Sequence, residues 1–213
     1  HLYRTQRLND GATLAEVTAE ITAAWQLGLT LLPITNDRIE TRVTVPSEGE
    51  IGFQEYFVRL RHDVSVESVR FAGAEQCAPA PGVLEAIGGA DVLIVAPSNP
   101  IVSIGPLLAV PGIRSALTAR RADAVAVSPI IAGKALKGPA DRLMAELGMD
   151  ASVTGVAEIY RELVATLVID NADAALAADV EAAGVDCVVT DTIMRDADVA
   201  ADLCRTILAS HPT

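Results

Sequence analysis

The sequence of 213 residues is poor in cysteine, histidine, lysine and aromatic side chains. Its three cysteines, Cys77, Cys187 and Cys204, lie far apart and form no CxxC pair. Neither a disulfide framework nor a cysteine-based zinc site is therefore supported, and a reducing cytoplasm is the expected location. The histidines, at positions 1, 62 and 211, are equally scattered, which argues against a histidine-centred metal or nucleophile site.

Positive charge and long apolar runs are also scarce. Lys and Arg number 16 against 28 Asp and Glu, so the net charge is -12 and the pI is about 4.6. A nucleic-acid-binding domain normally has a basic face, and 3% aromatic residues make a single-strand stacking platform unfavourable. No window reaches the roughly 18–20 apolar residues of a membrane span. With 51% hydrophobic residues and a mean hydropathy of +0.37, the sequence predicts one folded domain over residues 1–213.

The first residues do not have the pattern of a natural beginning. The chain opens at His1, and Leu2 to Leu8 have the pattern of the middle of a helix. We therefore expect the natural chain to begin further upstream. A second helix is predicted from Leu14 to Ile21, with Thr13 as its N-cap and Trp25 at its end.

Four continuous apolar runs dominate the chain from residue 81 onward. They cover residues 91–96, 124–127, 166–169 and 186–189, and runs of this kind are typical of parallel strands buried on both faces. Helical patterns lie around and between them, at residues 81–88, 113–120, 139–146, 156–164, 174–183 and 198–210. The alternation predicts an α/β fold, with a Rossmann-like parallel sheet and helices on both faces.

The segment from Thr41 to Phe71 has a different texture. Thr41 to Val45 alternates like a strand, Ser47 to Glu50 is a predicted turn, and residues 53–58 and 64–71 are rich in β-formers. We expect a small β-rich and helical insertion here. The aromatic cluster from Phe53 to Phe57 would be one face of a strand, or the wall of a site for an aromatic ligand.

Polar loops follow the predicted strands, at the sheet edge where α/β proteins bind ligands. Ser98, Asn99 and Ser103 come after the first run, before a helix whose backbone N–H groups could bind an anion. The alternative is a proline-stiffened turn in which Asn99 caps the helix. The segment lacks the GxxxxGK[ST] pattern of a P-loop.

The most informative loop follows residues 124–127. It contains the only two lysines, Lys134 and Lys137, between Gly133 and Gly138. In a chain of net charge -12, a diphosphate needs local cations, and two ammonium groups would supply them. The alternative is a solvated basic loop before a helix. Two further polar loops follow apolar runs, at Thr35, Asn36 and Asp37 and at Thr190 to Thr192. Each is either a ligand-binding loop or an Asx-turn.

These motifs resemble the 2-phospho-L-lactate transferase family of deazaflavin coenzyme biosynthesis. The resemblance is carried by residues 97–106 and 128–141, and continues through residues 31–37, 53–57, 170 and 190–192, so that it covers nearly the whole chain. Its actinobacterial members are similar to phosphoenolpyruvate transferases. The likeness implies a single α/β transferase domain.

The resemblance also implies a reaction. A GDP-activated three-carbon acid, phosphoenolpyruvyl or 2-phospholactyl, transfers its phospho-acid to the terminal ribityl hydroxyl of the deazaflavin Fo. GMP leaves, the product is coenzyme F-420-0 or its dehydro form, and Mg2+ assists. A homodimer is expected, without nucleic acid or membrane. Carried over to this sequence, phosphate or guanosine would be held by Ser98, Asn99, Ser103, Lys134 and Lys137. The acceptor cleft would be lined by Thr35, Asn36 and Asp37, with Gln54 and Tyr56 as weaker candidates.

One departure from the family pattern stands out. Family members open with a strand and a glycine-rich phosphate loop, followed by acidic residues, and none of this is in these 213 residues. No catalytic base or metal ligand is therefore assigned. Three other interpretations remain open: a nucleotide-sugar-binding regulatory relative, a nicotinamide-dependent oxidoreductase, and a non-catalytic dimerisation module. The second would require a GxGxxG motif, which the chain lacks.

Overall fold

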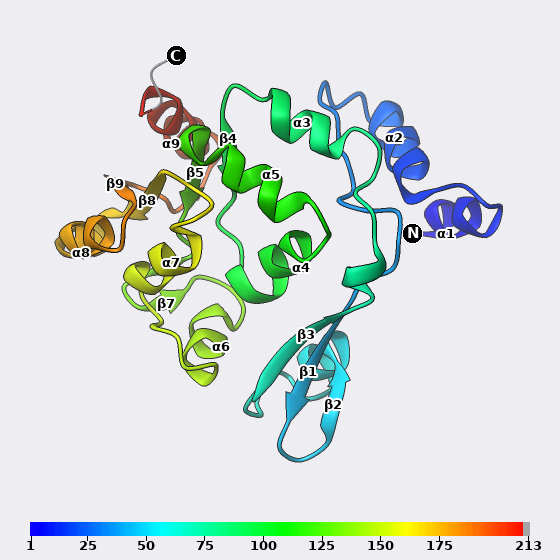
Figure 1. The fold of residues 1–213 in the computed structure, drawn as a ribbon, viewed down its shortest axis with the longest axis horizontal. Helices are drawn as coiled ribbons and strands as arrows, with labels where there is room; N and C mark the ends of the chain where they lie inside the picture. Colours follow the sequence, from blue (N-terminus) through cyan, green and yellow to red (C-terminus); the bar gives the residue numbers. More distant parts are fainter. Residues whose placement is uncertain (211–213) are drawn as a thin grey trace.

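The computed structural model describes residues 1–210, and Figure 1 shows three parts. A parallel sheet with its helices forms the left and centre of the view, a three-stranded lobe the bottom, and a pair of helices the upper right. The last helix lies on the parallel sheet, so the two ends of the chain are far apart across the view.

The parallel sheet has the strand order β4-β5-β8-β9. Its strands are β4 (Leu93–Val95), β5 (Ala124–Val127), β8 (Thr166–Asp170) and β9 (Asp186–Thr190). Every residue of β5 and β8 is buried, as the apolar runs predicted. The prediction is wrong for β4 and β9, where Ile94 is 46% exposed and Val189 is 37% exposed. Both are edge strands, with a neighbouring strand on one side only.

Helices cover both faces of this sheet, which confirms the predicted α/β class. They are α3 (Val83–Gly89), α4 (Gly105–Leu108), α5 (Ile113–Ala119), α6 (Ala140–Glu146), α7 (Val153–Tyr160), α8 (Ala177–Ala182) and α9 (Ala197–Ala209). Residues of α7, including Val156 and Tyr160, pack with Leu167 on one face, whereas Leu203 of α9 packs with Val168 on the other. This alternation follows from the period of two along a strand.

No single helix within residues 1–210 has the length and apolar character needed to cross a membrane. Pro100–Leu108 and Ile113–Ala119 meet the criterion only as a pair, bent by 94°.

The lobe is an antiparallel sheet of β1 (Glu40–Val45), β2 (Gly49–Gly52) and β3 (Ser68–Ala72), in the order β2-β1-β3. Its apolar face buries Val43, Val45 and Ile51. The predicted β-segment at residues 53–58 is wrong: it contains a wide helical turn, η1 (Glu55–Arg59). Tertiary packing overrides the β-propensity of the aromatic residues here, because the turn directs Tyr56 into the core of the lobe.

The first two helices, α1 (Leu2–Asn9) and α2 (Leu14–Ala24), lie beside the main body of the fold (Figure 1). None of the residues of α1 is buried. Thr13 is the N-cap of α2, as predicted, and it forms a capping box with Glu16. Arg7 and Tyr3 hydrogen-bond to the carboxylate of Glu20, and the bond from Arg7 is the main reason why the pKa of Glu20 falls to about 2.

Candidate functional site

A cavity of about 550 Å³ lies where the carboxyl ends of β4, β5 and β9 meet the lobe. This volume suits a nucleotide-sized ligand. The lining residues are Phe53, Phe57, Pro97, Ser98, Asn99, Val102, Ser103, Ser128, Pro129, Ile131, Ala135, Leu136, Lys137, Gly138, Pro139, Ala140, Thr192, Ile193 and Met194. The loops that follow three different strands therefore converge at one place, as the sequence predicted for the loops at residues 98–103 and 134–137.

The first loop carries Ser98, Asn99 and Ser103, and all three line the cavity. The side-chain oxygen of Asn99 accepts hydrogen bonds from the backbone N–H groups of Ile101 and Val102. The backbone carbonyl oxygen of Asn99 accepts hydrogen bonds from the N–H groups of Ser103 and Ile104. The capping alternative is thus correct, and these four amides are not free to bind an anion. Within residues 1–210 the hydroxyl groups of Ser98 and Ser103 have no protein partner, so they remain available as donors to a ligand.

The second loop is a hairpin of β6 (Ile130–Ile131) and β7 (Lys134–Ala135). Its two turn residues, Ala132 and Gly133, have φ values of 50° and 74°, as a tight two-residue hairpin requires. Both carboxylate oxygens of the buried Asp173 accept the N–H of Ala132, at 3.1 and 2.9 Å. This contact fixes the turn that precedes the lysines.

The two lysines have different positions in this hairpin. Lys137 lines the cavity, whereas Lys134 is exposed on β7 outside its lining. In the part of the chain that the structure describes, neither lysine takes part in an ion pair, although 11 ion pairs are formed by arginine. Two cations without carboxylate partners, one of them facing a cavity, are what an anionic ligand requires.

A buried hydrogen-bonded group holds the base of the cavity. Asp170, at the end of β8, accepts hydrogen bonds from the backbone N–H and the hydroxyl of Thr192, at 3.0 and 3.1 Å. Burial opposes ionisation of Asp170, but these bonds and one from the amide of Ala172 outweigh it, so that the pKa of the carboxyl is lowered. Thr192 is buried and lines the cavity, so its hydrogen bonds to Asp170 fix one part of the cavity wall.

The lobe supplies two side chains that the site prediction did not include. Phe53 and Phe57 lie four residues apart, with ring centres 5.8 Å apart, and both line the cavity. The aromatic cluster was the sequence signal for them, but a strand would also have placed Glu55 on the same face. Only the helical turn brings the two phenylalanine rings together and leaves Glu55 to pair with Arg59.

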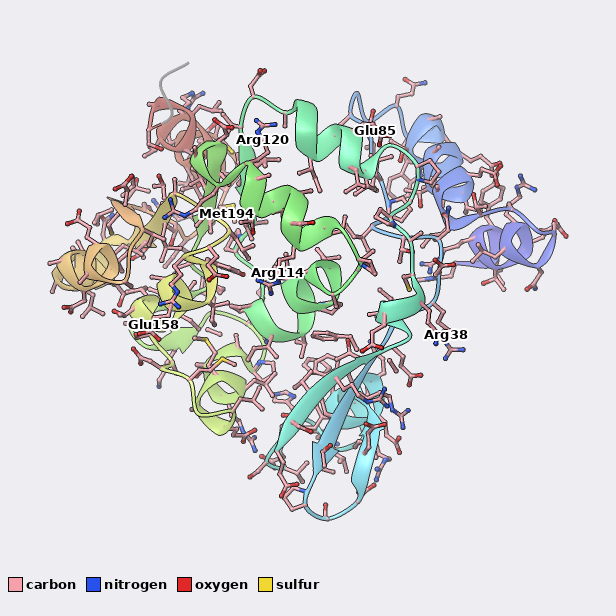
Figure 2. All side chains as sticks on the ribbon, in the orientation of Figure 1. Arg38, Glu85, Arg114, Arg120, Glu158 and Met194 are labelled. Carbon is pink, nitrogen blue, oxygen red and sulfur yellow. The ribbon has the colours of Figure 1, made fainter. Side chains whose placement is uncertain are left out.

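Besides Lys134, five predicted residues lie outside the cavity lining. Thr35 and Asp37 are bound to Ala78: the Thr35 hydroxyl donates to its carbonyl at 2.6 Å, and the Asp37 carboxylate accepts its N–H at 3.0 Å. Asn36 accepts the N–H of Ala15 at the start of α2. Figure 2 shows Arg38, the next residue, pointing outward. The loop thus forms a turn outside the cavity lining, and its role at the acceptor cleft stays a prediction.

The other two residues come from the aromatic segment. Gln54 is exposed. Tyr56 is fully buried in the lobe, where its hydroxyl has no partner among the described residues. Burial, and then the charge of Glu146, raise its pKa.

The described residues do not form a magnesium site by themselves. No group of three or more His, Cys, Asp or Glu side chains within residues 1–210 is arranged to hold a metal ion. His211, one of the three histidines, lies outside the described residues. The expected Mg2+ therefore stays a prediction, and no chemical step is derived through it.

The fold and the cavity together define a Rossmann-like α/β protein with a candidate ligand site at the carboxyl edge of its parallel sheet. The family model of 2-phospho-L-lactate transferase CofD matches residues 1–209. The chain belongs to this family of transferases.

Curated relatives support this assignment. The chain is 44% identical over 212 residues to a phosphoenolpyruvate transferase of Streptomyces griseus, covering 98% of this chain and 67% of that protein. It is also 44% identical over 213 residues to one of Kitasatospora aureofaciens, with 98% and 66% covered. The chain thus spans about two thirds of the length of these relatives.

Solved structures agree on the fold. The Bacillus halodurans protein BH3568 matches with a TM-score of 0.68 at 19% identity, over 97% of this chain and 70% of that one. A second structure of BH3568, described as a member of the upf0052 family, gives a TM-score of 0.67 at 17% identity.

Proposed function

We propose that this chain is the part of a phospho-acid transferase that holds the activated donor. The donor is a GDP-activated three-carbon acid, phosphoenolpyruvyl or 2-phospholactyl, and the acceptor is the terminal ribityl hydroxyl of the deazaflavin Fo. Support comes from the family, from relatives named phosphoenolpyruvate transferases, and from the cavity. The observation that carries the proposal is the convergence of unpartnered hydroxyls and Lys137 in one cavity at the sheet edge.

In the proposed reaction, the acceptor oxygen attacks the phosphorus that bears the three-carbon acid. The bond from this phosphorus to the phosphate of GMP breaks, GMP leaves with the bonding electrons, and the hydroxyl proton is released. The product is coenzyme F-420-0, or its dehydro form when the acid is enolpyruvyl. Lys137, with Lys134 near it, would neutralise the diphosphate, and Ser98 and Ser103 would donate hydrogen bonds to it. Positioning and charge neutralisation are the main requirements of such a transfer.

Calorimetric titration of GDP tests the donor site directly. The wild-type chain is compared with a variant in which Lys134 and Lys137 are both changed to Ala, in the presence and absence of Mg2+. Removing both cations should weaken GDP binding by roughly 10–100-fold, from about 1.5–3 kcal/mol of charge-assisted bonding. A requirement for Mg2+ in binding would support the expected metal.

Arg114→Ala is the matched control. Arg114 lies on α5, outside the cavity lining, and its loss changes the net charge of the chain by one unit without touching the site (Figure 2). Its affinity for GDP should equal that of the wild type. An unchanged affinity in the double lysine variant would contradict the proposal and favour a solvated basic loop. The homodimer and the cytoplasmic location stay predictions.

A further inference from the structure

The cavity has two chemically different sides. Ser98, Ser103 and Lys137 supply donors and charge on one side, and the other side is apolar. Several apolar lining residues are strongly exposed: Phe57 by 38%, Leu136 by 60% and Met194 by 50%. Large apolar side chains that gather at a cavity and remain in contact with water indicate that a ligand covers them.

The phenylalanine pair, Phe53 and Phe57, gives this apolar side a flat component, which we call the aromatic wall. Their rings are tilted by 31° with centres 5.8 Å apart, within the range of favourable aromatic contacts. Tyr56 lies between them in sequence but is fully buried in the lobe. The helical turn therefore separates one ring, used for the core of the lobe, from two rings that border the cavity.

The wall is supported from behind. The ring of His62 is stacked on that of Phe57, with centres 5.0 Å apart and planes within 18°. Arg61 and His62 are non-glycine residues with φ of 50° and 46°, a left-handed conformation that costs free energy and persists only where surrounding contacts impose it. The backbone N–H of His62 donates to the carbonyl of Tyr56 at 3.0 Å, which closes the loop over the helical turn.

Helix α6 holds the same loop from the side of the parallel sheet. Arg142 donates to the carbonyl of His62 and to Glu146, and Glu146 accepts the backbone N–H of Val66 at 2.9 Å. The first residue of α6, Ala140, lines the cavity. The aromatic wall is therefore fixed to an element that also borders the polar side.

From this arrangement we propose that Phe57, assisted by Phe53, is a binding residue that stacks against a planar heteroaromatic ring of the substrate. The inference rests on the proposed function, which offers two such rings, guanine and the deazaflavin. The polar part of the ligand, the diphosphate of the GDP derivative or the ribityl chain of Fo, lies toward Lys137, and the ring covers the exposed face of Phe57. Leu or Met at position 57 would keep an apolar surface but lose the flat face on which a ring stacks.

The test uses Phe57→Leu and the conservative variant Phe57→Tyr, with GDP and Fo titrated separately. Ligand proton NMR gives the decisive signal, because ring protons stacked on an aromatic side chain shift upfield. For one of the two ligands, Phe57→Leu should remove this shift and weaken binding about tenfold, as expected for the loss of one stacked ring. Phe57→Tyr should restore both. The ligand affected identifies which ring occupies the wall.

Phe71→Leu is the matched control, since Phe71 packs beside Gly105 and does not line this cavity. Thermal unfolding of each variant separates loss of binding from loss of fold. If Phe57→Leu binds both ligands as the wild type does and neither shows an upfield shift, the aromatic wall is wrong while the donor site stands. If Phe57→Leu weakens binding of one ligand while GDP binding ignores the lysine changes, the wall stands and the proposed donor site fails.

Discussion

The parallel sheet and the lobe are stabilised in different ways. In the sheet, β5 and β8 are buried along their entire length and carry no charge until Asp170. The lobe buries one face only, and its other face carries a ladder of charges in which Glu50 pairs with Arg42 and Arg70. Parallel sheets are characteristically buried on both faces, whereas antiparallel sheets often have one face in contact with water. The sheet thus depends on packing, whereas the surface of the lobe depends partly on ion pairs that salt can screen.

The largest expected effect lies in the sheet. Leu167→Ala removes a fully buried side chain of β8 and should lower the free energy of unfolding by about 2–5 kcal/mol. The same change at Leu136, which is 60% exposed, should cost little. Urea denaturation of both variants measures the difference, and equal losses would mean that β8 does not anchor the core.

An intermediate effect is expected at the end of the same strand. Asp170→Asn weakens the bonds to Ala172 and Thr192 and should cost about 1–3 kcal/mol at neutral pH. Because the pKa of Asp170 is lowered by folding, its contribution is complete above the ordinary aspartate value, about 3.9. It is lost as the pH falls through the lower value of the folded state.

The pH dependence of stability checks this assignment. The wild type and Asp170→Asn should differ most at neutral pH and converge below about pH 3. Asp202→Asn, in an exposed ion pair with Arg205, serves as the control. A difference that persists unchanged into strong acid would show that packing, not the charge of Asp170, is the cause.

The smallest effect is expected on the surface of the lobe. Glu50→Gln removes the carboxylate that pairs with both Arg42 and Arg70. The hydrogen bond from Arg70 is the main cause of the lowered pKa of Glu50. All three side chains are partly exposed, so the loss of stability should be small and should vanish at high salt. Denaturation at low and high ionic strength measures it. A salt-independent loss would remove the contrast between the lobe and the sheet.

The sequence predicted the sheet better than the lobe for a physical reason. A continuous run such as residues 124–127 has few ways to bury both faces other than a central strand. The aromatic segment at residues 53–58 has no comparable constraint, because its conformation depends on which ring enters the lobe core. That depends on contacts with Leu143 of α6, far away in the sequence.

The candidate site divides in the same way. The loops at Ser98 and Lys137 directly follow strands, and they line one cavity because the carboxyl edge of a parallel sheet brings them together. The loop at residues 35–37 follows an apolar segment that is not a strand, so the same rule failed there. Phe57 reaches the cavity from a separate lobe; the aromatic cluster marked its segment, but the local sequence does not predict which of the rings faces the cavity.

The register of the lobe also bears on how the molecule could be rebuilt. Glu40 and Ala72 are direct partners across β1 and β3, so the chain leaves and re-enters the scaffold through neighbouring positions. On either side, Ile39 and Cys77 pack into the main core. The two backbone connections of the lobe are therefore adjacent, and a short glycine linker could replace residues 41–71 without stretching the remaining backbone, at the cost of exposing Leu143 of α6. Such a minimal chain would retain Lys137 and the two serines, and it would lack the aromatic wall.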